Sequence, residues 1–88
     1  MNAHHRYQEI VVITGAGAGL GRATAREFAR HGAHLGLIGR DGHRLEAVRS
    51  EVEALGARTV VVSADVADAR QVEAAAECIE AGLGPIDI

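Results

Sequence analysis

The stretch Ile10–Gly21 reads IVVITGAGAGLG and predicts a strand followed by a glycine-rich loop. Its first four residues are β-branched and form an apolar run, which is typical of a strand buried on both faces. Four glycines then occur within the seven residues Gly15–Gly21, and they interrupt any regular element. A helix is predicted to follow over Leu20–His31, with Gly32 as its stop. The apolar positions of this helix that repeat near 3.6 residues are Leu20, Ala23, Thr24 and Phe28.

The same order of strand and helix occurs twice more along the chain. Strands are predicted over His34–Ile38 and Thr59–Val62, because both runs are short and largely apolar. A helix over Asp41–Leu55 is predicted between them, and Gly56 ends it. The apolar stripe of this helix consists of Leu45, Val48, Val52 and Leu55.

A third helix is predicted after Asp68, a residue type that caps helix N-termini. Its predicted apolar face consists of Val72, Ala75, Ala76 and Ile79. Cys78 lies on the same helix and is expected to be buried or half-buried. The residues predicted to end the helix are Gly82, Gly84 and Pro85. Ile86–Ile88 then has the composition of the start of a fourth strand.

Strands that alternate with helices in this way are expected to lie parallel, joined by right-handed crossovers. Helices on both faces of the sheet account for strands that are apolar throughout. The predicted fold class is therefore α/β, the N-terminal half of a doubly wound Rossmann fold, with a parallel sheet and the order β-α-β-α-β-α plus the start of a fourth strand. We interpret residues 1–88 as one partial Rossmann domain, truncated within a further strand–helix unit.

Length and composition limit the classes of function. Eighty-eight residues suffice for one small domain. The net charge is −3 and the nine basic residues, all arginine, form no stripe, so nucleic acid is not expected as a partner. No apolar run reaches the ~20 residues of a membrane helix and Met1–Glu9 is polar, so we expect a cytoplasmic protein without a membrane partner. A single cysteine, and histidines without ligand spacing, predict no metal site.

The glycine loop lies between a predicted strand and a predicted helix, where phosphate-binding turns occur. Glycines allow a tight backbone path and a close approach of the main chain to a pyrophosphate. The helix that begins near Leu20 directs its free N–H groups and its positive dipole end at the same place. We interpret the loop as a dinucleotide-binding site; the alternative is a flexible turn that joins a strand to a helix.

The pattern of the loop is Thr-Gly-x-x-x-Gly-x-Gly, with Thr14 followed by the pattern glycines Gly15, Gly19 and Gly21. In this pattern the chain resembles the short-chain dehydrogenase/reductase family in its classical form. The further features that agree are Arg40 after the second strand, Asp65-Val66 after the third and Gly84–Ile88 before the fourth. The resemblance covers Ile10–Ile88 and is specific at the level of the family, but it says nothing about the substrate.

The resemblance implies a role for each residue of the loop. The three pattern glycines would let the backbone wrap the pyrophosphate, and Leu20 with its neighbours would offer N–H donors. The Thr14 hydroxyl would pin the loop; the alternative is an ordinary strand threonine.

The resemblance also makes Arg40 the residue that selects the cofactor. In this fold an acidic residue at the end of the second strand binds the ribose hydroxyls and repels a 2′-phosphate. Gly39 stands there instead, and the Arg40 guanidinium has the geometry to hold a phosphate with two donors, so NADP is expected ahead of NAD. Two residues oppose this expectation: Asp41 places a carboxylate beside the pocket, and Ala18 replaces a basic loop residue found in many such enzymes. The alternative for Arg40 is a solvated arginine at a helix start.

Two further residues follow the third strand, at the edge where open α/β sheets bind ligands. The resemblance implies that the Asp65 side chain meets the adenine amino group and that the Val66 backbone lies along the ring. The alternative for Asp65 is a helix cap, although Asp68 is the better candidate for capping. Asp87 is expected to be structural.

The family's catalytic Tyr-x-x-x-Lys pair, in which the lysine lowers the pKa of the tyrosine, does not occur in this chain. The sequence contains no lysine, and its one tyrosine, Tyr7, precedes the first strand, so no catalytic residue is assigned. The favoured hypothesis is an NAD(P)-dependent oxidoreductase that moves hydride between nicotinamide and a small carbonyl or alcohol substrate. These residues would be its cofactor-binding part, inactive alone, and the complete enzyme a homo-oligomer. The alternative is a non-catalytic module that binds or senses a dinucleotide.

Overall fold

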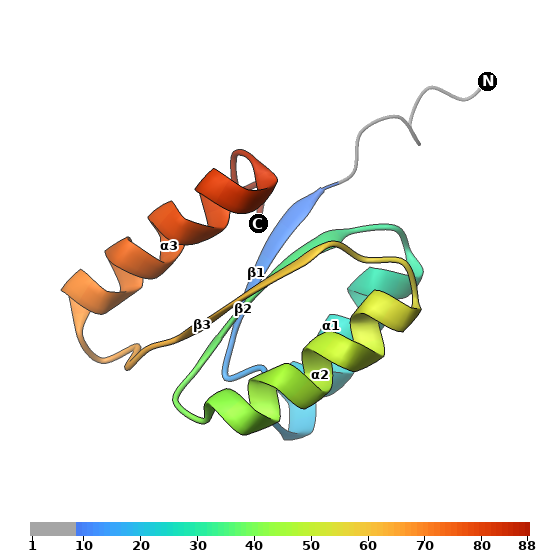
Figure 1. Ribbon diagram of the computed structural model, residues 1–88, viewed down its shortest axis with the longest axis horizontal. Helices are drawn as coiled ribbons and strands as arrows, with labels where there is room; N and C mark the ends of the chain where they lie inside the picture. The colour runs from blue at the N-terminus through green and yellow to red at the C-terminus, as the bar shows by residue number, and fades with distance from the viewer. Residues whose placement is uncertain (1–8) are drawn as a thin grey trace.

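The computed structural model describes residues 9–88, in which strands and helices alternate (Figure 1). In chain order the elements are β1 (Ile10–Thr14), α1 (Gly19–Arg30), β2 (His34–Gly39), α2 (Gly42–Ala54), β3 (Thr59–Ser63) and α3 (Ala69–Leu83). The predicted order is confirmed, and each strand extends one residue beyond its predicted carboxyl end. Tyr7 lies outside the described residues. None of the helices in residues 9–88 is both long and apolar enough to cross a membrane.

The three strands form one parallel sheet in the order β1-β2-β3. The register aligns Ile10 with His34 and Leu35 with Thr59, so the carboxyl ends of all three strands meet at one edge. Figure 1 shows α1 and α2 on one face of the sheet and α3 on the other. Parallel strands covered by helices on both faces confirm the predicted α/β class and the N-terminal half of a Rossmann fold.

Each face of the sheet has its own apolar cluster. Toward α1 and α2, Leu35 and Leu37 of β2 pack against the stripe of α2, and toward α3, Ile38 packs with Ile79. The side chains of β2 alternate between the two faces, as the pleat of a strand requires. The three predicted residues of α2 that are fully buried are Leu45, Val48 and Val52.

The sequence-based prediction of the buried face is wrong in part for α1. The buried residues of that helix are Ala25 and Ala29, whereas Leu20 is 83% exposed at its first turn. Small side chains allow α1 to lie close to β1 and β2, and the predicted Phe28, which is partly buried, packs against the same cluster. Leu55 caps the end of α2 and is 44% exposed. Cys78 is exposed on α3, so the prediction that it is buried or half-buried is wrong.

The end of α3 also differs from the prediction. Gly82 lies inside the helix, which continues to Leu83 and ends at Gly84 with φ of +110°. Residues 86–88 are not assigned as a strand, yet they lie along β1: Asp87 N donates to Ile10 O at 2.9 Å and Val12 N donates to Ile88 O at 2.8 Å. The Asp87 carboxylate accepts a bond from Ile10 N at 2.8 Å, which agrees with its predicted structural role.

Gly36 lets α3 approach β2 closely. An ideal Cβ at Gly36 would lie 2.5 Å from Cδ1 and 2.7 Å from Cγ2 of Ile79, which is fully buried. A glycine inside a strand usually weakens it, but it also marks a close approach of another element. Here the absent Cβ is what allows Ile79 to sit directly on the sheet.

We expect Gly36→Ala to destabilise the fold by about 1–3 kcal/mol, because the buried Ile79 side chain has no free space to enter. Urea unfolding measures this loss. In an Ile79→Ala background the colliding atoms are gone, so the same substitution should cost much less there. Losses that simply add in the double variant would contradict the steric explanation.

His34, the first residue of β2, is a buried polar residue held by a main-chain contact. Its Nδ1 atom accepts a hydrogen bond from the backbone N–H of Arg58 at 2.9 Å, which requires that nitrogen to be unprotonated. Burial, and to a smaller extent the charge of Arg58, lower the pKa of His34 from its ordinary value. The folded protein therefore favours the neutral ring.

The free energy of unfolding should consequently fall as the pH drops below about 6.5, because the unfolded chain then binds a proton that folded His34 resists. Above that pH the contribution of His34 is fully present. His34→Asn retains a hydrogen-bond acceptor and does not titrate. The free energy of unfolding of this variant should therefore fall less in acid than that of the unsubstituted protein. Urea unfolding between roughly pH 8 and pH 5 compares the two. An identical pH dependence would contradict the role of this histidine.

Candidate functional site

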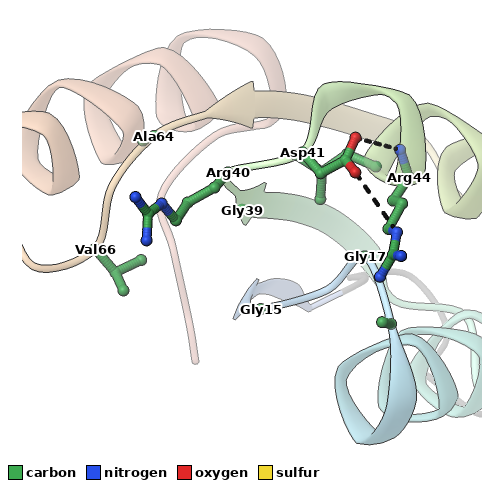
Figure 2. A pocket seen from close by; sticks show the side chains of 10 residues that line it. Gly15, Gly17, Gly39, Arg40, Asp41, Arg44, Ala64 and Val66 are labelled. Carbon is green, nitrogen blue, oxygen red and sulfur yellow. Dashed lines mark hydrogen bonds and ion pairs between the residues drawn. The ribbon is translucent and has the colours of Figure 1, made fainter.

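The carboxyl ends of the strands border a cavity of about 290 Å³ (Figure 2). Its walls come from the loop after β1, the end of β2 with the start of α2, and the segment after β3. The lining residues are Gly15, Gly17, Ala18, Gly39, Arg40, Asp41, Arg44, Leu45, Ala64 and Val66. Open parallel α/β sheets bind ligands at this edge, so this cavity is the candidate site.

The glycine loop depends on glycine for two different reasons. Gly15 and Gly19 have φ of +65° and +57°, in the left-handed region that other residues rarely adopt. Gly21 is required by proximity: an ideal Cβ there would lie 2.2 Å from the carbonyl oxygen of Gly15. Gly15 N in turn donates to Ile38 O at 2.9 Å, which ties the loop to β2. The three pattern glycines therefore bring α1, β1 and β2 together.

The N-termini of the three helices differ in how their free N–H groups are satisfied. Asp41 caps α2 by accepting bonds from His43 N and Arg44 N, and Asp68 caps α3 in the same way. The cap residue of α1 is Ala18, which provides no side-chain acceptor, and the first turn of α1 contains no acidic residue. The helix that follows the glycine loop thus has N–H groups and a positive dipole end free for an anion.

The main chain of Arg40, just after β2, is held by hydrogen bonds from the end of β3. Ser63 Oγ donates to the Arg40 carbonyl at 3.2 Å, and Ala64 N donates to the Gly39 carbonyl at 2.8 Å. Figure 2 shows the Arg40 side chain extending toward Val66. Because its backbone is tied to β3 and its side chain lines the cavity, Arg40 is suited to bind an anion there.

Asp65 forms a turn after β3 and does not cap α3. Its carboxylate accepts a hydrogen bond from Ala67 N at 2.9 Å, and its own N–H donates to Gln71 Oε1 at 2.8 Å. The cap of α3 is Asp68, so the capping alternative for Asp65 is wrong. Asp65 is adjacent in sequence to the lining residues Ala64 and Val66.

The structure brings together only part of the predicted set. Gly15, Arg40 and Val66 line the cavity. Gly19 lines a neighbouring hollow between α1 and α2. The predicted residues that line neither are Thr14, Leu20, Gly21 and Asp65. Thr14 is exposed at the end of β1, and Gly21 acts through its contact with Gly15.

Sequence reasoning missed Arg44, which lies in the first turn of α2 and lines both the cavity and the neighbouring hollow. Its Nε lies 3.5 Å from Asp41 Oδ2, and its Cβ is 3.0 Å from where a Cβ on Gly17 would be. The available signal was its position three residues after the cap Asp41, because the first turn of a helix that follows a strand faces the same edge of the sheet.

These features define a class of protein, the nucleotide-binding α/β proteins of Rossmann type, with a glycine loop at the carboxyl edge of a parallel sheet. The family model described as short chain dehydrogenase matches residues 9–88, and the chain belongs to this family.

The relatives agree in both sequence and fold. The 2,3-dihydro-2,3-dihydroxybenzoate dehydrogenase of Bacillus subtilis is 39% identical over 88 residues, which cover all of this chain and 34% of that protein. A short chain dehydrogenase/reductase from Burkholderia phymatum in complex with NAD has a TM-score of 0.85 at 35% identity, covering 90% of this chain and 28% of that one.

An alcohol dehydrogenase from the archaeon Thermococcus sibiricus complexed with 5-hydroxy-NADP has a TM-score of 0.87 at 34% identity, covering 92% of this chain and 35% of that one. The chain thus spans about a third of the length of these relatives.

The contact of Gly21 with Gly15 predicts the sign of a substitution. Alanine is ordinarily favoured over glycine in a helix by about 1 kcal/mol, but here the collision should outweigh this and Gly21→Ala should destabilise the fold. Gly42→Ala, in the first turn of α2 with open space around its Cβ, is the matched control and should not destabilise. Chemical unfolding of both variants provides the comparison, and a stabilised Gly21→Ala would disprove the steric role.

Proposed function

We propose that this chain is the cofactor-binding part of an NADP(H)-dependent oxidoreductase that transfers hydride between nicotinamide and a carbonyl or alcohol group. The observation that carries the proposal is the glycine loop, whose uncapped helix α1 begins beside a cavity that Arg40 and Arg44 line. The assignment to the short chain dehydrogenase family supports the reaction type.

The residues present fit a dinucleotide. Gly15 and Gly19 give the loop the positive-φ path that lets main-chain N–H groups face a phosphate. The cavity joins this loop to the apolar surface of Ala64 and Val66, a suitable wall for a flat base. Phosphate and adenosine would thus find complementary groups in one continuous site.

Cofactor choice rests on the end of β2. Position 39 is a glycine and not an acidic residue, so no carboxylate repels a 2′-phosphate there. The guanidinium group of Arg40 can donate two hydrogen bonds to such a phosphate. Asp41, whose carboxylate opposes this choice in the sequence, is engaged by His43 N, Arg44 N and Arg44 Nε. The solved relatives include complexes with both NAD and an NADP derivative, so the preference is argued from these residues alone.

The nicotinamide group, when bound, supplies the hydride acceptor or donor. The residues described have three tasks: Gly15 and Gly19 shape the loop, the first turn of α1 faces the phosphates, and Arg40 selects the 2′-phosphate. We assign no proton-transfer residue among them. Hydride transfer is therefore proposed for the complete enzyme, and these 88 residues alone are expected to be inactive.

The test is the dissociation constant of NADP(H) and of NAD(H), measured by calorimetry on the full polypeptide whose reading frame contains this segment. Arg40→Leu should weaken the binding of NADP(H) about tenfold and leave the affinity for NAD(H) nearly unchanged. The reason is that a charge-assisted hydrogen bond contributes ~1.5–3 kcal/mol. If the ratio of the two dissociation constants is unaltered, Arg40 has no part in selecting NADP(H) over NAD(H).

Gly39→Asp should reverse the preference, because the new carboxylate repels a 2′-phosphate and accepts the ribose hydroxyls. A Cβ at this position would lie 3.2 Å from Leu45 Cδ2, so some repacking is expected. Gly39→Asn imposes the same packing without the charge and is therefore the control. If both variants change the ratio equally, packing and not charge is responsible.

A further inference from the structure

We infer that Arg44 is a second specificity-determining residue for a 2′-phosphate, acting from α2 in place of the basic loop residue that this chain lacks. The inference rests on the proposed function and extends it. Ala18 and Arg44 line the same cavity, so a charge missing from the loop is supplied by the neighbouring helix.

The position of Arg44 is determined by packing as well as by charge. Its Cβ lies 3.0 Å from the ideal Cβ site of Gly17, so α2 meets the loop at this residue. Figure 2 shows the guanidinium group of Arg44 beside Gly17 and that of Arg40 directed toward Val66. The two arginines therefore lie on different sides of the cavity, Arg44 at the glycine loop and Arg40 toward the segment after β3. A phosphate bound at the loop would meet Arg44 directly, and Arg40 would reach it by turning its side chain toward the loop.

The carboxylate of Asp41 orients Arg44 without neutralising the site. Oδ1 of Asp41 accepts bonds from His43 N and Arg44 N, and Oδ2 lies 3.5 Å from Arg44 Nε. The two Nη atoms of Arg44 have no hydrogen-bond partner within residues 9–88. Both side chains of this pair are more than half exposed, and such ion pairs are weak, so a phosphate dianion can recruit the guanidinium.

The charges of the cavity agree with this role. Its titratable lining residues are Arg40, Asp41 and Arg44, which together leave one net positive charge. Without Arg44 the positive charge of Arg40 and the negative charge of Asp41 would cancel, and the cavity lining would have no net charge. The discrimination in favour of a 2′-phosphate should therefore depend on both arginines.

The experiment uses the full polypeptide and two probes that differ only in the 2′-phosphate, 2′,5′-ADP and 5′-AMP, with dissociation constants from calorimetry. Arg44→Leu should weaken the binding of 2′,5′-ADP about five- to tenfold and that of 5′-AMP less than twofold. The larger loss is the one expected when a single charge-assisted hydrogen bond is removed at an exposed site. Arg44→Lys should retain most of the affinity, because it keeps the charge.

Arg49→Leu is the matched control, since Arg49 lies on the same helix, pairs with Glu46 and Glu53, and does not line the cavity. If Arg40→Leu abolishes the preference but Arg44→Leu behaves like Arg49→Leu, the inference about Arg44 is wrong while the proposed function stands. If the unsubstituted protein does not prefer 2′,5′-ADP, the proposed NADP(H) preference itself fails, and the inference fails with it.

Discussion

The contact between Gly21 and the carbonyl of Gly15 is the constraint on which the rest of the site depends. Only without a Cβ at Gly21 does the first turn of α1 lie against the loop that leaves β1. The same loop is tied to β2 by the bond from Gly15 N to Ile38 O. Strand, loop and helix are thereby held in one geometry, and the free N–H groups of α1 are placed at the carboxyl edge of the sheet.

Charge is distributed around this edge in a way that suits an anionic ligand. Asp41 and Asp68 satisfy the N-termini of α2 and α3, whereas α1 has no side-chain cap. Asp41 also holds Arg44 beside the loop, so one carboxylate stabilises a helix and orients a cation. The uncapped end of α1 and the two cavity-lining arginines all lie at this edge, and on the function proposed above they would favour a phosphate over a neutral group.

The order of elements could be predicted from the sequence because short apolar runs between glycines are compatible with few structures. The buried face of α1 could be predicted only in part: Phe28 packs against the core as expected, but the fully buried residues are Ala25 and Ala29, and Leu20 is exposed. A ranking by hydrophobicity places large residues inside, yet close packing at a helix–sheet contact favours small ones. Gly36 is a similar case, because its meaning depends on Ile79, a residue far away in the chain.

By itself the sequence determined the glycine spacing, the sign of each charge and the absence of a carboxylate at Gly39. These follow from residue type, and they suffice to indicate a phosphate-binding loop and a basic residue after β2. Only the tertiary structure decided that Arg44 shares a cavity with Arg40 and that Asp41 is engaged by its own helix. The physical reason is that such proximity depends on how α2 packs against the sheet and the glycine loop, which brings together side chains from separate elements.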